Sequence, residues 1–289
     1  MRDRLICAAR SAWYGLSERA RLRLERHRHA DWYAADAAYD RIFADNRAYR
    51  DDVAGQGKPL ISILLPTHNR AHLLLSRALP SVLRQTYRNF EVIVACHGCT
   101  DDTVDCVAEL SDADPRLDWL EIDRRQHYPP TAENHWLAGP VDPLNAALAE
   151  CRGQWIARID DDDVWTPDHL ERLLRFAQAG DYEFVSGAHR THEGKVGPYD
   201  LDGVKVGGCQ CWLYRSYLKM FRYNRFCWAK AHNRVNDTDL QDRFRKAGVR
   251  MGYLDEVVAE ILPRPGEKHV GLKAYKANPD KAERLFAFD

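Results

Sequence analysis

Residues 155–167 read WIARIDDDDVWTP, and this stretch decides the fold class of the chain. Its first five residues, 155–159, form a short apolar run, which is typical of a strand buried on both faces in a parallel sheet. Four consecutive aspartates, residues 160–163, follow this strand directly. Thr166 and Pro167 then stand at the cap and first-turn positions of a predicted helix, whose apolar stripe is Leu170, Leu173, Leu174 and Ala177. The stretch therefore predicts a strand, an acidic turn and a helix.

The same alternation of strand and helix precedes this stretch. Apolar runs at residues 60–65, 90–95 and 117–122 predict three further strands, the first of them ended by Pro66. Helical stripes separate the runs: Leu75, Leu79, Val82 and Leu83 with a kink at Pro80; Val104, Val107 and Ala108 after a cap at Thr100; and Leu144, Ala147, Leu148 and Cys151. Alternation of this kind predicts an α/β fold with a doubly wound, Rossmann-like, mostly parallel sheet flanked by helices. Ligands of such sheets bind at the carboxyl ends of the strands.

The composition is that of a globular protein with 289 residues, of which 45% are hydrophobic and 29% are charged. The formal net charge of −1 argues against a nucleic-acid-binding function, because neutralising phosphates requires a basic surface. No apolar run approaches the roughly 20 residues of a membrane-spanning helix, and the N-terminus has no signal-peptide pattern. We therefore expect a cytoplasmic protein.

Two pairs of cysteines are closely spaced, Cys96 with Cys99 and Cys209 with Cys211. Zinc ribbons pair two CxxC knuckles, and the second pair here is too short to be one. We therefore expect ordinary reduced thiols rather than a zinc site or a disulfide framework.

Residues 1–58 differ from the rest and predict an N-terminal helical extension before a catalytic domain at residues 59–289. Within residues 1–30 there are eight arginines against three acidic residues, and apolar residues recur there at helical spacing. One interpretation is a basic helix that contacts the inner face of a membrane. The other, which we favour, is that the apolar stripe packs on the main domain.

The four aspartates 160–163 predict a site for a divalent metal and a diphosphate. Adjacent like charges repel, and a strand end gives them no structural benefit. A hard cation such as Mn²⁺ or Mg²⁺ would bridge such carboxylates to phosphate oxygens. The alternative is a solvated acidic turn, but the position at the end of a buried strand and before a capped helix favours the metal site.

A missing residue type narrows the function further. No glycine occurs between Gly57 and Gly98, so the first strand–helix turn is neither a dinucleotide-binding fingerprint nor a P-loop. This absence also argues against a nucleotidyltransferase, and it predicts that side chains hold the nucleotide.

The ordered motifs of residues 59–265 resemble glycosyltransferase family 2, whose members have the GT-A fold. Each motif is weak alone, but their order is specific. In chain order they are residues 63–70 (ILLPTHNR), 83–87 (LRQTY), 90–94 (FEVIV), 97–103 (HGCTDDT), Asn145 with 152–153 (RG), 159–163 (IDDDD) with Trp165 and Pro167, and 236–240 (NDTDL) with Gly248.

The resemblance implies an inverting, metal-dependent hexosyltransferase that uses a UDP-, GDP- or dTDP-sugar. It implies that the nucleotide is bound by Pro66, Thr67, Asn69, Arg70 and His97, together with Asp160 and Asp161 toward the ribose and diphosphate. Asp162 would be the principal metal ligand, assisted by Asp160, in a DxD motif. Asp237 would be the general base that takes the proton of the acceptor hydroxyl.

The sequence departs from the family pattern at two positions. His97 stands where the family usually has an aspartate that reads the nucleobase, and Asn236 replaces a common glutamate before the base. Asn236 also has the character of a helix N-cap, which would place Asp239 where a carboxylate reaches back to the cap. Asp237 would then be free to face a cleft near the positive end of the helix.

The predicted function is sugar transfer to a glycan, a lipid-linked molecule or another hydroxyl acceptor, in surface polysaccharide or glycoconjugate synthesis. Two alternatives stay open: a catalytically inactive sugar-nucleotide-binding or scaffold protein, and a nucleotidyltransferase on a similar sheet. Residues 126–145 are rich in aromatic and turn residues, and they form either a lid or wall for the acceptor or a packed surface loop.

Overall fold

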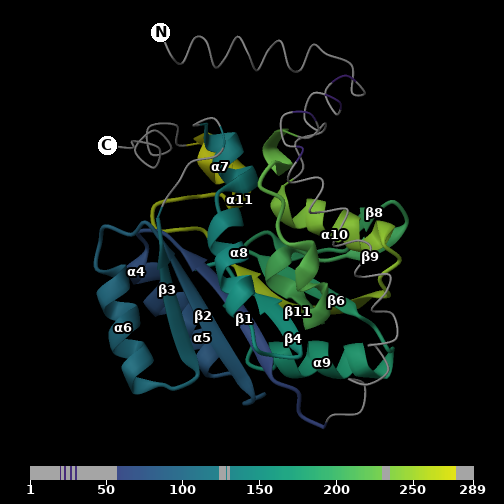
Figure 1. Cartoon of the computed structure of the whole chain (residues 1–289), viewed down its shortest axis with the longest axis horizontal. Helices are drawn as coiled ribbons and strands as arrows, with labels where there is room; N and C mark the ends of the chain where they lie inside the picture. The colour runs from purple at the N-terminus through teal and green to yellow at the C-terminus, as the bar shows by residue number, and fades with distance from the viewer. Residues whose placement is uncertain are drawn as a thin grey trace.

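The computed structural model describes residues 57–123, 128, 131–229 and 235–277, and four isolated helical positions, Ala20, Arg23, His27 and Ala30. The predicted helical extension, residues 1–58, lies almost entirely outside the described residues. The remaining residues form a layered α/β domain (Figure 1).

The described residues contain a nine-stranded sheet with the neighbour order β3-β2-β1-β4-β10-β6-β11-β5, in which β7 also pairs with β6. The strands are β1 (Ile61–Thr67), β2 (Phe90–His97), β3 (Leu117–Ile122), β4 (Trp155–Arg158), β5 (Asp163–Trp165), β6 (Phe184–Thr191), β7 (Gly194–Val196), β10 (Trp212–Arg215) and β11 (Met251–Ile261). Six of them, β1 to β4, β6 and β11, share one direction, whereas β5, β7 and β10 run antiparallel to their neighbours. The predicted mostly parallel sheet is therefore confirmed.

Helices cover both faces of this sheet, as predicted. They are α4 (Ala71–Leu73), which continues through a π-turn at Leu74–Ala78 into α5 (Leu79–Leu83), then α6 (Thr103–Ala113), α7 (Ala132–Ala138), α8 (Val141–Glu150), α9 (His169–Ala179), α10 (Asn236–Lys246) and α11 (Gly271–Ala277). A two-stranded hairpin, β8 (Tyr199–Leu201) with β9 (Val204–Val206), and short 3₁₀ segments at Cys209–Cys211, Ser216–Phe221 and Cys227–Ala229 complete the described elements.

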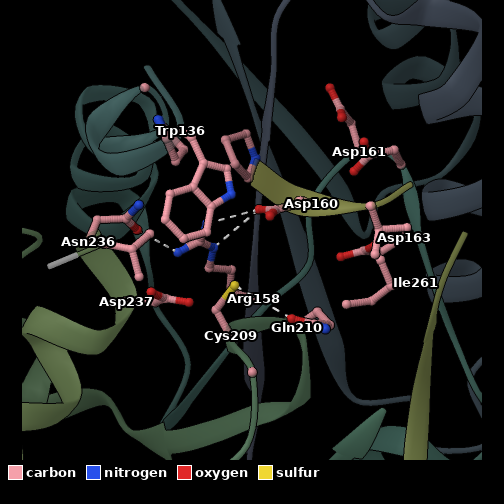
Figure 2. Close-up of a pocket in the computed structure, with 18 of the residues that line it drawn as sticks. Trp136, Arg158, Asp160, Asp161, Asp163, Cys209, Gln210, Asn236, Asp237 and Ile261 are labelled. Atoms are coloured by element: carbon pink, nitrogen blue, oxygen red, sulfur yellow. Dashed lines mark hydrogen bonds and ion pairs between the residues drawn. The ribbon is translucent and has the colours of Figure 1, made fainter. Parts of the chain in front are cut away.

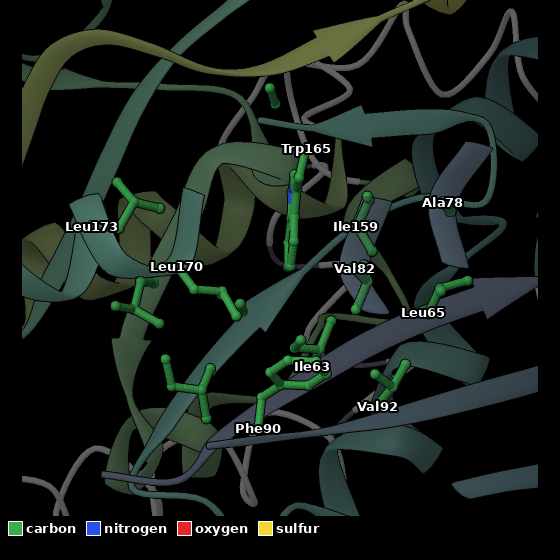
Figure 3. Packing of buried hydrophobic residues seen from close by; sticks show 14 of the residues in the cluster. Ile63, Leu65, Ala78, Val82, Phe90, Val92, Ile159, Trp165, Leu170 and Leu173 are labelled. Atoms are coloured by element: carbon green, nitrogen blue, oxygen red, sulfur yellow. The ribbon is translucent and has the colours of Figure 1, made fainter. Parts of the chain in front are cut away.

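Alternate residues of the central strands face the two helical layers, because successive side chains of a strand point to opposite faces. Ile61, Ile63 and Leu65 of β1 belong to a buried cluster with residues of α5, α6 and α9. Figure 3 shows part of this cluster, including Val82, Leu170 and Trp165. Leu64 points the other way, into a second cluster that contains residues of α8 and α10.

The prediction that Pro66 ends the first strand was wrong by one residue, because β1 runs to Thr67. Pairing with β4 stops at Leu64, whereas pairing with β2 continues to Thr67. Pro66 thus lies where β1 has a neighbour on only one side, and there a residue without an N–H is tolerated. Pro80, at which a kink is predicted, lies in the first turn of α5, directly after the π-turn Leu74–Ala78.

Two predicted helix caps were also wrong. Helix α6 begins after Asp102, and Thr100 instead donates its backbone N–H to Asn69 at 2.7 Å. Helix α9 begins after Asp168, because the Thr166 N–H and hydroxyl both bond the Val258 carbonyl of β11, at 3.1 and 3.2 Å. In both cases a contact with a distant segment occupies the residue whose local pattern suggested a cap.

Candidate active site

A cavity of about 560 Å³ opens at the carboxyl ends of β1, β2 and β4, the edge at which the fold class predicts a ligand. Figure 2 looks into this cavity and shows aspartates from the turn after β4 on one side and Asp237 of α10 on the other. Every predicted site residue except Asn69 lines it: Pro66, Thr67, Arg70, His97, Asp160, Asp161, Asp162 and Asp237. The fold thus brings together four segments that are far apart in the sequence: residues 66–70, His97, residues 160–162 and the start of α10.

Asp161 is buried and ties the turn after β4 to the end of β1. Its two carboxylate oxygens accept hydrogen bonds from the Thr67 hydroxyl and from Arg70 Nη1, each at 2.8 Å. Burial raises the pKa of Asp161 to about 6, and Arg70 and Thr67 only partly oppose this. Because both oxygens are engaged, Asp161 has the contacts of a residue that positions the turn.

Asp160 and Asp162 are the more accessible members of the acidic turn. Asp162 Oδ2 lies 3.4 Å from Arg70 Nη1 and 3.8 Å from Arg264 Nε. Asp160 accepts from Arg158 through Oδ1 alone, and no described residue donates to its Oδ2. The fourth aspartate, Asp163, is buried in β5, where burial and the three neighbouring carboxylates raise its pKa well above the ordinary value.

The carboxylates of Asp160 and Asp162 fit a hard divalent cation for which the protein supplies only some of the ligands. No group of three or more His, Cys, Asp or Glu side chains in the described residues is arranged to bind a metal. Mg²⁺-type sites, however, commonly use one or two carboxylates and take their other ligands from substrate phosphates and water. Asp160 and Asp162 both line the cavity and are partly accessible, so they meet that requirement.

Arg158 connects the acidic turn to helix α10 and was not predicted. Its buried guanidinium donates to Asp160 Oδ1 at 3.0 Å and to Asn236 Oδ1 at 2.9 Å. Burial alone would lower the pKa of Arg158, but the carboxylates of Asp160 and Asp237 outweigh it and raise that pKa well above the ordinary value. Arg158 therefore remains charged and bridges the two sides of the cavity.

The prediction that Asn236 caps helix α10 was wrong. The cap position belongs to Val235, and Asn236 is the first helical residue. Its side chain is buried between Arg158 and α7, where Nδ2 donates to the Leu137 carbonyl at 3.0 Å. A tertiary hydrogen-bond network thus takes the amide that would have bonded the helix end.

With the helix starting at Asn236, the carboxylates of Asp237 and Asp239 have different surroundings. Asp237 lies in the first turn of α10, lines the cavity, and accepts the Thr238 N–H at 2.7 Å. Asp239 is buried, and its Oδ2 pairs with Arg243 Nε at 3.2 Å, so the predicted contact with the helix cap was wrong. Of the two carboxylates, only Asp237 is a cavity-lining residue.

The nucleotide-side loops are held together by their own side chains. His97 ends β2 and lines the cavity, and its carbonyl accepts from His68 Nδ1 at 2.7 Å. Asn69 adopts a left-handed conformation with φ of 51° and is exposed. Its side chain bonds Thr100, so Asn69 joins two loops instead of facing the cavity.

Further cavity residues come from segments that the motifs did not single out. The segment after β11 contributes Arg264, Glu267 and His269, and the β8–β9 hairpin contributes Tyr199 and Asp200. No local pattern in the sequence marks these residues as site residues. Helix α7 contributes His135 and Trp136, so the described part of segment 126–145 forms a wall of the cavity.

Comparison with known proteins identifies the family. The family model described as "Glycosyl transferase family 2" matches residues 62–244. An "Uncharacterized glycosyltransferase" of Haemophilus influenzae is 32% identical over 168 residues, which cover 58% of this chain and 59% of the relative. A "UDP-Glc:alpha-D-GlcNAc-diphosphoundecaprenol beta-1,3-glucosyltransferase WfgD" of Escherichia coli is 30% identical over 128 residues, covering 44% of this chain and 45% of the relative. The matches therefore span only about half the length of these relatives.

Solved structures of low sequence identity share the fold. The mannosyltransferase PcManGT from Pyrobaculum calidifontis, in complex with GDP-Man and Mn²⁺, has a TM-score of 0.55 at 16% identity, covering 93% of this chain and 74% of that one. S. aureus TarS 1-349 in complex with UDP-GlcNAc has a TM-score of 0.52 at 15% identity, covering 78% of this chain and 65% of that one. From the family match and the shared GT-A architecture, we conclude that this chain belongs to glycosyl transferase family 2.

Proposed function

We propose that this protein transfers a sugar from a nucleotide-sugar to an acceptor hydroxyl with inversion, in the synthesis of a surface polysaccharide or glycoconjugate. The observation that supports this most directly is the placement of the Asp160–Asp162 turn and Asp237 on opposite sides of one cavity, joined through Arg158. A transferred sugar fits between a site for the leaving diphosphate and a base for the acceptor.

On the donor side, Asp160 and Asp162 would hold Mn²⁺ or Mg²⁺. When bound, the cation supplies positive charge to the departing diphosphate. Arg70 and Arg264 flank Asp162 and would add cationic contacts for the phosphates. Thr67 and Arg70 keep Asp161 in place, so the turn has a fixed shape before the donor binds.

Pro66, Thr67, Arg70 and His97 would line the pocket for the nucleoside, and Asn69 would support that pocket by holding the Thr100 loop. The donor is a UDP-, GDP- or dTDP-sugar. UDP-GlcNAc and GDP-Man occupy the two related structures, which is consistent with a nucleotide-sugar in a cavity of this kind.

On the acceptor side, Asp237 would accept the hydroxyl proton as the sugar is transferred. Trp136 on the wall formed by α7 offers an aromatic surface to an acceptor. The acceptor is a glycan or a lipid-linked molecule; the relative WfgD is named for a diphosphoundecaprenol acceptor. We place this activity in the cytoplasm, at or near the inner face of the membrane. Among the described residues, no helix is long and apolar enough to span a bilayer.

Donor hydrolysis without an acceptor tests this function. We expect the purified protein to release UDP, dTDP or GDP slowly from one of UDP-glucose, UDP-GlcNAc, dTDP-glucose or GDP-mannose with Mn²⁺, and we expect this release to stop when EDTA is added. Asp162→Asn should abolish the release, because the variant lacks the proposed metal ligand. Asp168→Asn is the matched control: Asp168 lies in the same segment and pairs with Arg172, outside the cavity lining. Full activity in EDTA or in Asp162→Asn would contradict the metal role. The absence of hydrolysis of any donor, with or without binding, would favour the catalytically inactive sugar-nucleotide-binding or scaffold protein.

A further inference from the structure

Two glutamines on the cavity wall have similar burial but different hydrogen bonding. Gln210 and Gln241 are 4% and 3% exposed, and both line the cavity. Gln241 Nε2 donates to the Gly207 carbonyl at 2.9 Å. Gln210 Nε2 is buried and finds no hydrogen-bond partner among the described residues. Buried amide donors are almost always paired, so a donor that has no partner at a cavity wall indicates a partner that arrives with a ligand.

The Gln210 side chain is held in place by its surroundings. The backbone carbonyl of Gln210 accepts the indole N–H of Trp165, the last residue of β5, at 2.7 Å, which fixes the Gln210 backbone to this strand. The Gly207 carbonyl accepts from both Gln241 and Trp212, so the preceding loop is fixed too. A Cβ at Gly208 would come within 2.9 Å of Gln210 Oε1, so glycine at this position leaves the room that the amide occupies.

Gln210 lies between the acidic turn, where the metal and diphosphate are proposed to bind, and Asp237, the proposed base. Figure 2 shows it below Asp160, with Asp237 on one side and Asp163 on the other. The neighbouring Cys209 also lines the cavity, and Figure 2 shows it below Arg158, between Asp237 and Gln210. Gln210 therefore lines the part of the cavity between the proposed diphosphate site at Asp160 and the proposed base Asp237.

We propose that the Gln210 amide donates a hydrogen bond to a hydroxyl of the donor's transferred sugar and so contributes to the choice of sugar. This inference rests on the proposed function. A site built to bond a hydroxyl rejects a donor that lacks it, because the buried amide is then left unpaired. Among the described residues, Gln210 Oε1 meets only the weak Cys209 thiol donor, at 3.6 Å, so the amide oxygen can also accept from the same sugar.

The test measures binding of UDP-glucose, UDP-GlcNAc and GDP-mannose beside UDP and GDP, with Mn²⁺, by calorimetry. For Gln210→Met, we expect the preferred nucleotide-sugar to bind roughly threefold to tenfold more weakly, the equivalent of one lost hydrogen bond, with the free nucleotide diphosphate unaffected. The melting temperature should not fall, since methionine fills the same space without a buried unpaired amide. Gln85→Met is the control: Gln85 is likewise buried, lies outside the cavity lining and donates to the Ser81 and Thr166 carbonyls at 3.0 and 2.7 Å, so this variant should lower the melting temperature and leave the ratio of the two affinities unchanged.

Equal weakening of the sugar and the free diphosphate, or an unchanged ratio in Gln210→Met, would overturn the proposal. Failure of the proposed function would look different, because the wild-type protein would then bind neither ligand class. Monodeoxy donors provide a second measurement that needs no variant. The monodeoxy donor that lacks the hydroxyl bonded by Gln210 should bind the wild-type protein roughly threefold to tenfold more weakly than the full donor. Equal affinity for every monodeoxy donor would also overturn the inference.

Discussion

Arg158→Met should destabilise the protein because it removes the buried cation that joins the acidic turn to helix α10. The Arg158 side chain is 3% exposed, and Asp160, its ionic partner, is 35% exposed. Methionine approximates the length of the aliphatic part of arginine. The loss of stability would therefore come from the missing guanidinium contacts and not from a cavity. The change would leave the buried Asn236 Oδ1 without its donor and Asp160 without its counter-ion.

The size of the effect follows from these contacts. A hydrogen bond to a charged group contributes about 1.5–3 kcal/mol, and a buried acceptor left without a donor costs about 1–3 kcal/mol. Water can reach Asp160, which lowers its share, so we expect a total of about 3 kcal/mol, near the lower end for breaking a fully buried pair. For a domain of this size, 3 kcal/mol corresponds to a fall in melting temperature of roughly 6–12 °C.

Thermal unfolding in EDTA measures this fall without compensation by a bound metal. Arg175→Met is the matched control, since its pair with Glu171 has a similar distance of 2.8 Å but exposures of 75% and 42%. We expect that control to change the stability by less than about 0.5 kcal/mol. Asn236→Ala and the double variant complete a cycle, in which Arg158 and Asn236 should couple by about 1 kcal/mol. A fall for Arg158→Met no larger than that for Arg175→Met would refute the bridging role.

Three further outcomes test the site and the buried histidine. Asp237→Asn should lower turnover by at least ~10² while the donor still binds, because the variant lacks the proposed base. Asp239→Asn should instead cost about 1–2 kcal/mol of stability through its pair with Arg243 and keep turnover; the reverse result in well-folded variants would reassign the base. His97→Ala should weaken nucleotide affinity more than turnover in binding and rate measurements, and unchanged affinity would place the nucleobase elsewhere. Burial lowers the pKa of His169 from 6.5 to about 3, so the unfolded chain gains a proton that the folded chain does not, and stability should fall as the pH drops from about 6.5 toward 3. Urea unfolding of His169→Gln should show a smaller loss between pH 7 and 5, and an identical loss would contradict this assignment.

The sequence alone determined the layered fold and the edge at which the site lies. The apolar run at residues 155–159 and the runs before it are local patterns with the period of buried strands, so they needed no knowledge of distant contacts. The third strand was predicted with its observed bounds, Leu117–Ile122. The position of the four aspartates after a central strand was equally local, and it placed them at the carboxyl edge of the sheet.

The tertiary structure determines which aspartates are accessible to a ligand and which are bonded or buried within the protein. The four consecutive aspartates cannot be told apart from the local sequence. In the structure, Thr67 and Arg70 bond Asp161, and Asp163 is buried in β5. Of the four, only Asp160 and Asp162 remain accessible. Contacts between distant segments also displaced the predicted helix starts. Arg158 lies 78 residues from Asn236 in the chain, and it donates a hydrogen bond to the Asn236 side-chain oxygen. A polar cap residue is preferred over an apolar one by about 0.5–2 kcal/mol, whereas a buried, charge-assisted hydrogen bond contributes about 1.5–3 kcal/mol and therefore prevails.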